Sequence, residues 1–430
     1  MGIVKNTVGI KDYLVYGFGQ VINLIAPLLI APFIIAKCGI ENFGKVGVAT
    51  SIFTLLALFI EFGSNILGVK EISSNKNDSI EIRRYLNLSF SFKIIALLLI
   101  AFTTILVIFI IDIKEKSLYI LGLSMLIAQL FNTTWVLQGL EQFTAINKLI
   151  FFSKILYLLL VYVLIKHDTD YIYVLFLLGI SNTLVYSFFF FKIYRFFKLS
   201  LFSFNFNVFK KFVKNESSIL LSNLSISVYC QFPILIVQYL LGDYFAGIYK
   251  IGDMILSVFR SYLGVFFNVS FPKFCSICSK SELKGMLLIK KINLINILLL
   301  SIGVVVVVMF EIVILFVIQV DTEIRDLIVY YTGFIIIPII IAVNIPFYQF
   351  LLYKNEQKAL SKIFFSGVLI MMFSCFLGTY KYRLIGTLAA VFFTESLISF
   401  LKILYCFMNY NEEIKTFRMK IERAERIGVL

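Results

Sequence analysis

Twelve runs of apolar residues follow one another along this chain of 430 residues. A helix needs about 20 such residues to cross the hydrocarbon core of a bilayer. The runs predict an all-α fold, that of a polytopic membrane protein with about twelve transmembrane helices. They lie at 13–36, 46–68, 85–111, 118–139, 149–165, 171–191, 216–241, 244–272, 287–318, 327–353, 363–380 and 384–408.

The composition excludes a soluble globular protein. Hydrophobic residues make up 60% of the chain and charged residues 15%, whereas a soluble domain has roughly half and a quarter. The 47 Phe and 23 Tyr side chains exceed what a soluble core of this size can cover. Lipid is therefore expected around most of the chain.

The basic residues set the orientation of the helices. The N-terminus, every second loop and the C-terminus together hold 26 Lys and Arg, and the alternate loops hold 8. Basic loops stay in the cytoplasm, so both termini are expected there. Most of the basic residues behind the net charge of +14 thus lie in short loops beside the membrane. They do not form the single basic face of a nucleic-acid-binding protein, so no nucleic-acid partner is expected.

The longest predicted loop, at 192–215, is basic and lies in the middle of the chain. It divides the sequence into a six-helix lobe at 1–191 and a second at 216–408, followed by a cytoplasmic tail at 409–430. Six is an even number, so both lobes enter the membrane from the same side and would form a parallel repeat. At an offset of 202, the turn at 41–44 aligns with the segment 243–246, which also follows the first helix of its half.

Ionisable residues inside a bilayer cost roughly 2.5–3.5 kcal/mol each and usually face a bundle interior or a water-filled cavity. Three of the lysines lie near cytoplasmic helix ends, where their long side chains can instead reach the surface. These are Lys93, Lys154 and Lys402. The other predicted intramembrane ionisable residues are Glu61, Lys250, Asp253, Arg260, Glu311 and Glu395.

The eighth span has the most concentrated polar face. Lys250, Asp253 and Arg260 are spaced i, i+3 and i+10, which places them on one side of a helix. One interpretation is a structural ion pair between Lys250 and Asp253, which leaves Arg260 with no further partner at this spacing. The alternative is a cationic cavity lined by Lys250, Arg260 and Lys93 that binds an anionic head group such as a diphosphate.

Three carboxylic acids are candidates for ion coupling: Glu61, Asp253 and Glu395. Buried acids can titrate near neutral pH, although a permanently protonated, hydrogen-bonded acid is an equally good explanation. Polar stripes on the first and seventh spans predict a polar cavity lining at Gln20, Asn23, Asn223 and Gln231. Hydrogen bonding between helices is the alternative role for these stripes.

Catalytic and metal chemistry have little support. The single histidine, His167, lies in a short outer loop, and no nucleotide-binding or nucleophile motif is present. Cys275 and Cys278 form a CxxC pair without a second ligand pair nearby. No enzyme activity, metal or cofactor is therefore expected.

Four segments resemble the Wzx family of O-antigen flippases, in the multidrug/oligosaccharidyl-lipid/polysaccharide exporter superfamily. The most specific is 135–141, where Trp135, Gln138, Gly139 and Glu141 match W-x-x-Q-G-x-E. The other three are the turn at 39–44, the aromatic-Pro-basic segment at 271–273, and the run at 384–390 that precedes Glu395. In the last of these, Leu384 and Thr387 depart from the commoner small residues.

The resemblance implies two MATE-like six-helix lobes around a cationic cavity, in a bacterial inner-membrane flippase. Its substrate would be an undecaprenyl-diphosphate-linked repeat unit, moved to the periplasmic leaflet by alternating access with ion coupling. Membrane lipid, an O-antigen polymerase and a chain-length regulator would be its partners. A cation-coupled multidrug-type exporter of the same superfamily is the alternative, and it would need a cavity dominated by acids and aromatics.

Overall fold

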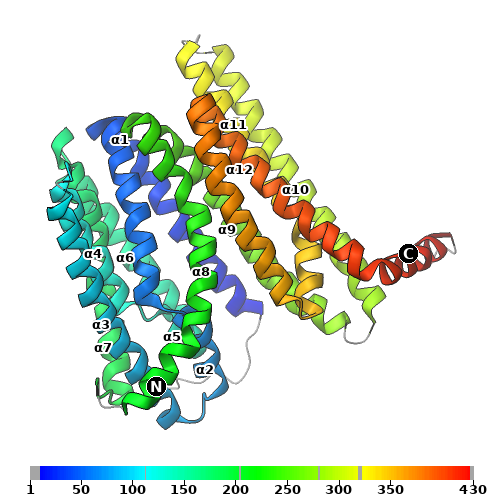
Figure 1. The fold of residues 1–430 in the computed structure, drawn as a ribbon, viewed down its shortest axis with the longest axis horizontal. Helices are drawn as coiled ribbons and strands as arrows, with labels where there is room; N and C mark the ends of the chain where they lie inside the picture. Colours follow the sequence, from blue (N-terminus) through cyan, green and yellow to red (C-terminus); the bar gives the residue numbers. More distant parts are fainter. Residues whose placement is uncertain (1–9, 112, 203–204, 279–280, 318–321, 427–430) are drawn as a thin grey trace. The chain divides into compact units, whose positions relative to one another are not determined.

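The computed structural model describes residues 10–111, 113–202, 205–278, 281–317 and 322–426. Within these ranges the chain is helical and contains no β-strand. Its elements, in order, are α1 (Ile10–Glu61), η1 (Ser64–Gly68), α2 (Val69–Ser74), α3 (Ser79–Ile110), α4 (Lys116–Phe131), α5 (Thr134–Gly139), α6 (Phe143–Leu164), η2 (Asp168–Ile172), α7 (Tyr173–Phe197), α8 (Phe206–Leu241), α9 (Asp243–Cys278), α10 (Glu282–Val317), α11 (Thr322–Tyr353) and α12 (Gln357–Arg426) (Figure 1).

In the part of the chain that the structure describes, ten helices are long and apolar enough to cross a membrane. Two of them contain a break in the backbone. The first, α1, has a non-helical residue at Gly39, and α12 has non-helical residues at Tyr382 and Arg383. These breaks divide each helix into two spans, so the predicted all-α fold with about twelve transmembrane segments is confirmed.

The backbone at Gly39 is repeated later in the chain. Gly39 has φ 84° and ψ 161°, and Gly242, between α8 and α9, has φ 92° and ψ 178°. Both residues combine a positive φ with an extended ψ, and this combination favours glycine because glycine has no Cβ. The two turns are 203 residues apart, so the structural register of the proposed repeat differs by one residue from the predicted offset of 202.

The helices that leave these two turns touch each other through glycine. A Cβ placed on Gly44 would collide with the carbonyl oxygen of Asp243, and one placed on Gly247 would collide with that of Ile40. Residues 40 and 44 correspond to residues 243 and 247 in the same register of 203. The contact is therefore reciprocal, because each of the two turns is followed by the same pair of contacting positions.

Two predicted spans are shorter in the structure than the hydropathy indicated. The span predicted at 46–68 stops as an α-helix at Glu61; Phe62 and Gly63 have positive φ, and the π-helix η1 follows. The span predicted at 118–139 is interrupted after Phe131, where the Asn132 side chain accepts a hydrogen bond from the backbone N–H of Thr134. Hydropathy is continuous across both breaks, so it did not reveal them.

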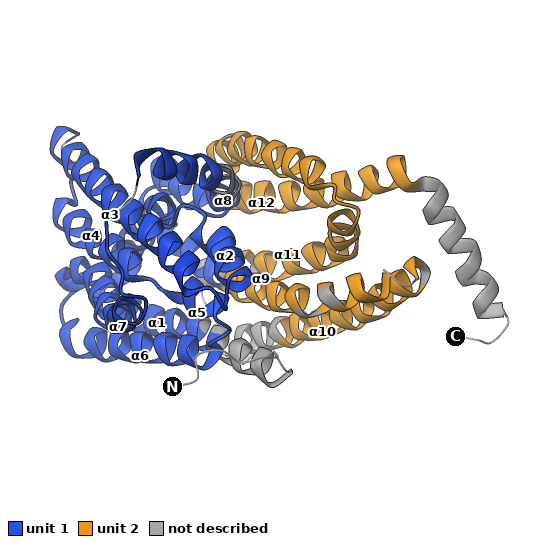
Figure 2. Ribbon diagram, turned by 90° about the horizontal axis from the view of Figure 1, so that it is seen from below, with its two compact units in different colours: residues 1–254 blue, residues 255–430 orange. Residues whose placement is uncertain are grey.

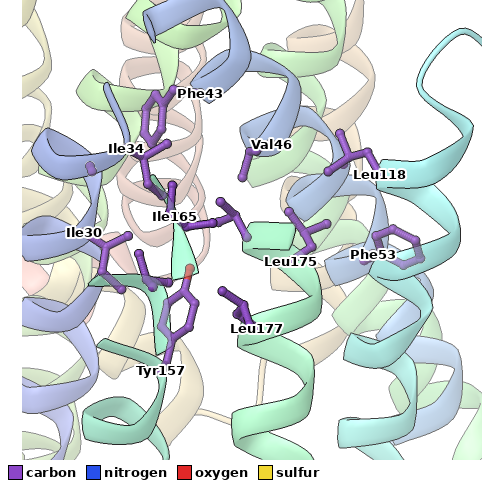
Figure 3. Packing of buried hydrophobic residues seen from close by; sticks show 14 of the residues in the cluster. Ile30, Ile34, Phe43, Val46, Phe53, Leu118, Tyr157, Ile165, Leu175 and Leu177 are labelled. Atoms are coloured by element: carbon purple, nitrogen blue, oxygen red, sulfur yellow. The ribbon is translucent and has the colours of Figure 1, made fainter. Parts of the chain in front are cut away.

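Residues 1–254 and 255–430 form two compact units (Figure 2). In the first unit, α1 packs on α4, α6 and α8, and α7 packs on α4 and α6. Its largest apolar cluster joins residues such as Ile34, Phe53, Leu118 and Leu175 (Figure 3). In the second unit, α11 packs on α10 and α12, and Phe274, Ile289 and Phe350 belong to one buried cluster. The division into lobes at 1–191 and 216–408 stays a prediction.

Much of the predicted linker at 192–215 is helical. Helix α7, which corresponds to the sixth predicted span, continues to Phe197. Helix α8 begins at Phe206, where the Asn205 side chain accepts a hydrogen bond from the N–H of Asn207. An Asn in this position satisfies a free N–H at the helix start. The basic side chains of this segment are exposed: Lys192, Arg195, Lys198, Lys210, Lys211 and Lys214.

Large apolar side chains cover the outside of several helices. On α3, for example, Leu98, Phe102 and Phe109 are each more than 60% exposed. Apolar surface of this extent is not stable in water, and lipid contact accounts for it. The chain is thus a multi-pass membrane protein.

Candidate functional site

The predicted polar face of the eighth span lies on α9 and forms two separate ion pairs. In the first unit, Lys250 Nζ lies 3.0 Å from Asp253 Oδ2, and both side chains are largely buried. Gly47 leaves room for the lysine stem, since a Cβ there would lie 3.0 Å from Lys250 Cγ. The structural pairing of Lys250 with Asp253, one of the two interpretations of the sequence, is therefore present.

Arg260 has an acidic partner that its own helix does not supply. Its Nη2 lies 2.9 Å from Oε1 of Glu395 on α12, and the exposed side-chain fractions are 21% and 10%. The helical spacing on α9 predicted no further partner for Arg260, and the partner in the structure is 135 residues away in sequence. The pair joins a substrate-binding candidate to an ion-coupling candidate.

The same face of α12 continues to a buried lysine. Glu395, Ser399 and Lys402 are spaced i, i+4 and i+7, and all three are buried. Lys402 Nζ donates to Asn344 Oδ1 at 3.2 Å, and Asn344 Nδ2 donates to Ser399 Oγ at 2.7 Å. The ammonium also lies 4.9 Å and 4.5 Å from the ring centroids of Tyr348 and Phe364.

Lys402 therefore does not reach the surface, and that explanation of its position is wrong. It was not among the predicted site residues. The signal that could have identified it is its spacing of seven from Glu395 on one helix face. We call Arg260, Glu395, Asn344, Ser399 and Lys402 the second-unit cluster.

Lys93, predicted to line a cationic cavity, is also buried, with 1% of its surface exposed. It does not extend to the surface either. Its Nζ has no hydrogen-bond partner in the part of the chain that the structure describes, and it lies 5.6 Å from the ring centroid of Phe90 and 5.1 Å from that of Trp135. Aromatic faces attract a desolvated cation, which accounts for this position. The nearby carboxyl of Glu61 interacts with it electrostatically.

The W-x-x-Q-G-x-E segment holds the broken helix ends of the first unit together. Trp135 is buried, and a Cβ on Gly68 would lie 2.5 Å from its indole ring. A Cβ on Gly139 would lie 2.7 Å from Cβ of Ile72. Both glycines are thus required for α5 to approach η1 and α2 closely.

The last residue of the segment is also fixed. Glu141 has φ 58° and forms an ion pair of 2.5 Å with Lys76. The fourth residue, Gln138, is half-buried, and its carbonyl oxygen accepts a hydrogen bond from the N–H of Glu141. These contacts give the motif a structural role at the junction of α2 and α5.

A carboxylic acid that was not among the predicted site residues lies near this junction. Glu216 on α8 is buried, and its Oε1 accepts a hydrogen bond of 2.6 Å from the hydroxyl of Tyr85 on α3. Its spacing from Phe209 and Phe212, by seven and four residues, places it on the same helix face as two packed aromatics. That spacing was the available signal.

The predicted polar lining residues do not share one environment. Asn223 Nδ2 donates to Asn65 Oδ1 at 3.2 Å, which fits hydrogen bonding between helices. Asn23 is exposed and Gln231 is half-buried. The side chain of Gln20 lies outside the described residues, and so does that of Glu311. Among the described residues, no three His, Cys, Asp or Glu side chains are grouped to bind a metal ion.

Comparison with known proteins covers most of the chain. Residues 10–278 match the family model described as "Polysaccharide biosynthesis protein". A protein of Shigella dysenteriae named "Putative O-antigen transporter" is 22% identical over 386 residues, with 87% of this chain and 94% of the relative covered. A protein of the same name from Escherichia coli K12 is 19% identical, with 89% and 93% covered.

The fold is that of solved multidrug exporters. An inward-facing multidrug resistance MATE family transporter of the MOP superfamily aligns with a TM-score of 0.64 and 12% identity over 96% of each chain. An outward-facing structure of such a transporter aligns with a TM-score of 0.60 and 13% identity over 96% of each chain. At this level of identity the alignment shows the fold alone.

Proposed function

Because this chain belongs to the polysaccharide biosynthesis protein family, we propose that it flips undecaprenyl-diphosphate-linked polysaccharide repeat units across the bacterial inner membrane. The resemblance to O-antigen flippases is confirmed by the family model and by relatives that cover nearly the whole chain. In this proposal both termini are cytoplasmic, and two six-helix lobes alternate between openings to the cytoplasm and to the periplasm.

The second-unit cluster is the observation that carries the proposal. It contains a buried cation, Lys402, a partly buried cation, Arg260, and a buried acid, Glu395. Its formal charge is therefore +1, and burial makes an excess charge costly unless an anion compensates it. A diphosphate supplies that anion and matches the planar, two-pronged donor geometry of arginine.

The pairing of Arg260 with Glu395 suggests how binding is coupled to an ion. A diphosphate that engages Arg260 would displace the carboxylate, which is left in a buried position without its counter-charge. Such a carboxylate binds a proton more readily. We assign Arg260 as a substrate ligand and Glu395 as the acid whose protonation accompanies substrate binding. Lys250 and Asp253 form a second such exchange pair on α9. Lys93, which interacts with Glu61 only electrostatically, is the third cation that we assign to the substrate.

Purified protein in proteoliposomes tests the proposal. Labelled lipid-linked repeat unit would cross the bilayer faster than in protein-free vesicles, and an inward-acidic pH gradient would change the rate. Arg84→Ala provides a control, because Arg84 is an exposed arginine paired with Glu81 at the surface. A rate equal to that of empty vesicles, with Arg260 and Arg84 variants indistinguishable, contradicts the flippase. Resistance to cationic dyes on expression would instead support the multidrug exporter.

The partners implied by the resemblance can be expected from the product. A repeat unit delivered to the periplasmic leaflet is the substrate of a polymerase, and an O-antigen polymerase with its chain-length regulator is the expected consumer. Cross-linking of the full-length protein in a polysaccharide-producing strain would recover these two proteins. Recovery of neither would remove the direct-partner part of the proposal and leave the transport part intact.

A further inference from the structure

The carboxyl group of Glu216 is buried, and none of the described basic side chains forms a hydrogen bond with it. It is 2% exposed, and Oε1 accepts a hydrogen bond from Tyr85, whereas Oε2 has no hydrogen-bond partner among the described residues. Among the described residues, the candidate membrane span of α8 is Asn223–Leu241, and Glu216 precedes it at the first residue of the span predicted at 216–241. A fully ionised carboxylate with one unsatisfied oxygen is costly in such a place.

The charged groups around Glu216 come from two other helices. On α3, Tyr85 donates the hydrogen bond and Lys93 contributes a positive charge at longer range; on α2, Glu71 contributes a negative one. The ammonium of Lys93 is occupied by aromatic rings rather than by the carboxyl group, because its Nζ has no hydrogen-bond partner. The basic residues of the same helix, Lys211 and Lys214, are exposed.

The start of α8 is attached to α3 through three side chains on one face. The ring centroids of Phe209 and Phe92 are 6.3 Å apart, and those of Phe212 and Tyr85 are 5.5 Å apart. The carboxyl group of Glu216 accepts a hydrogen bond from the hydroxyl of Tyr85. The spacing of 209, 212 and 216 is that of a single helix stripe. Tyr85 is central to this contact, and its ring also lies 6.1 Å from Trp135.

We propose that Glu216 is a proton-binding residue, and that loss of its proton releases the start of α8 from α3. The proton binds at Oε2, converts the carboxylate to the neutral acid, and leaves Oε1 as the acceptor for Tyr85. When the proton leaves to cytoplasmic water, the buried charge is best accommodated by outward movement of the helix. Only the role of this step in the transport cycle rests on the proposed function; the proton binding does not.

The proton affinity agrees with this geometry. Burial raises the pKa of Glu216 to about 7; the Tyr85 hydrogen bond and Lys93 act in the opposite direction, and Glu71 raises it further. Because this pKa lies above the ordinary value of about 4.3, the folded contact retains a proton that the unfolded chain loses. The attachment of α8 is therefore fully stabilised below about pH 4.3 and weakens as the pH rises toward 7 and beyond.

The chain contains a built-in probe for this change. Trp135 is the single tryptophan of the 430 residues and contacts Tyr85. In lipid nanodiscs without substrate, the emission of Trp135 should change between pH 5.5 and 8.5 with a midpoint near pH 7. Glu216→Gln should abolish this transition and keep the low-pH emission throughout, since glutamine imitates the neutral acid.

Two further variants make the test specific. Tyr85→Phe removes the hydrogen bond that favours the ionised form, so the midpoint should move to higher pH. Glu115→Gln changes an acid at a different pair, with Lys45 and Tyr171, and should leave the titration unchanged. A wild-type protein without a transition, or a Glu216→Gln protein that titrates like wild type, would overturn the proposal. If Glu216→Gln fails to fold, the Tyr85→Phe variant decides. A midpoint of the Trp135 titration at higher pH in that variant supports the proposal, and an unchanged midpoint contradicts it.

Transport measurements separate this inference from the proposed function. A protein that shows the Trp135 titration but moves no lipid-linked repeat unit retains the proton site and refutes the flippase. A protein that moves the lipid with the same pH profile in wild type and Glu216→Gln retains the flippase and refutes a role for Glu216 in the cycle. A role in the cycle requires the pH profile of transport to flatten in Glu216→Gln.

Discussion

Buried charges have different surroundings in the second-unit cluster and in the part of the first unit around Trp135. In the second unit, Arg260 and Lys402 each have an oxygen partner within 3.2 Å. Near Trp135 in the first unit, Lys93 and Glu216 each have a polar atom without a hydrogen-bond partner among the described residues; the Lys93 ammonium lies over aromatic rings, and Tyr85 binds the other oxygen of Glu216. The difference separates two uses of buried charge. A paired cation can exchange its carboxylate for an anionic ligand, whereas an unpaired group is stabilised most simply by gaining or losing a proton.

The largest effect is expected at the second-unit pair. Arg260→Ala should lower lipid translocation at least tenfold in proteoliposomes, because the anion loses its ligand. It should also destabilise the fold by up to about 3 kcal/mol, since Glu395 is left buried without its partner. Thermal unfolding in detergent, alongside the transport assay, separates the two losses.

A double variant isolates binding from stability. Arg260→Ala combined with Glu395→Gln removes both charges and should recover most of the thermal stability but none of the transport. Arg260→Lys should restore transport in part, because the charge is kept and the two-pronged geometry is not. Full transport in the double variant would mean that the pair has only a structural role. The second-unit cluster would then not exchange its carboxylate for an anionic ligand.

A smaller effect is expected at Lys402. Lys402→Met should reduce stability by about 1–3 kcal/mol, because Asn344 loses a charged donor inside the protein. A lysine that reached the surface would show almost no change on this substitution. A melting temperature equal to that of wild type would therefore contradict the buried position.

The first unit should be most sensitive at its packing contacts. Gly68→Ala places a methyl group against the indole of Trp135 and should cost about 1–3 kcal/mol. Gly264→Ala is the matched control, because no atom lies within 4 Å of a Cβ at that position in α9. Equal melting temperatures for the two variants would show that the Trp135 contact is loose.

The smallest effect concerns a partly buried ion pair of the first unit, between Lys45 and Glu115. Burial acts against ionisation of Glu115, but hydrogen bonds from Tyr171 and Lys45 outweigh it and lower its pKa. The stabilisation is therefore present above the unfolded pKa of about 4.3 and is lost as the pH falls through the folded value. Melting curves of wild type and Glu115→Gln should differ by no more than about 1 kcal/mol at pH 7 and converge toward pH 3.

The membrane fold could be predicted from the sequence because hydropathy reports directly on lipid contact. The turns at Gly39 and Gly242 fall where the apolar runs were separated, whereas the breaks at Phe62–Gly63 and Asn132–Thr133 lie inside continuous runs. Those breaks depend on local hydrogen bonding and on positive φ values. Neither property changes the mean hydropathy of a window.

The candidate site was only partly accessible to the same reasoning. Spacing along one helix identified Lys250 with Asp253, because both partners lie within one turn. Arg260 with Glu395 joins helices 135 residues apart, and periodicity within a helix carries no information about such a pair. Lys402 and Glu216 lie at the ends of apolar runs, where hydropathy cannot distinguish a buried charge from a surface one.

The reciprocal contact of Gly44 and Gly247 has a consequence for how this protein can change over generations. A larger residue at Gly44 would displace the carbonyl oxygen of Asp243, and a larger residue at Gly247 would displace that of Ile40. Each substitution therefore moves the backbone next to the other glycine. We expect the two positions to vary together among related sequences.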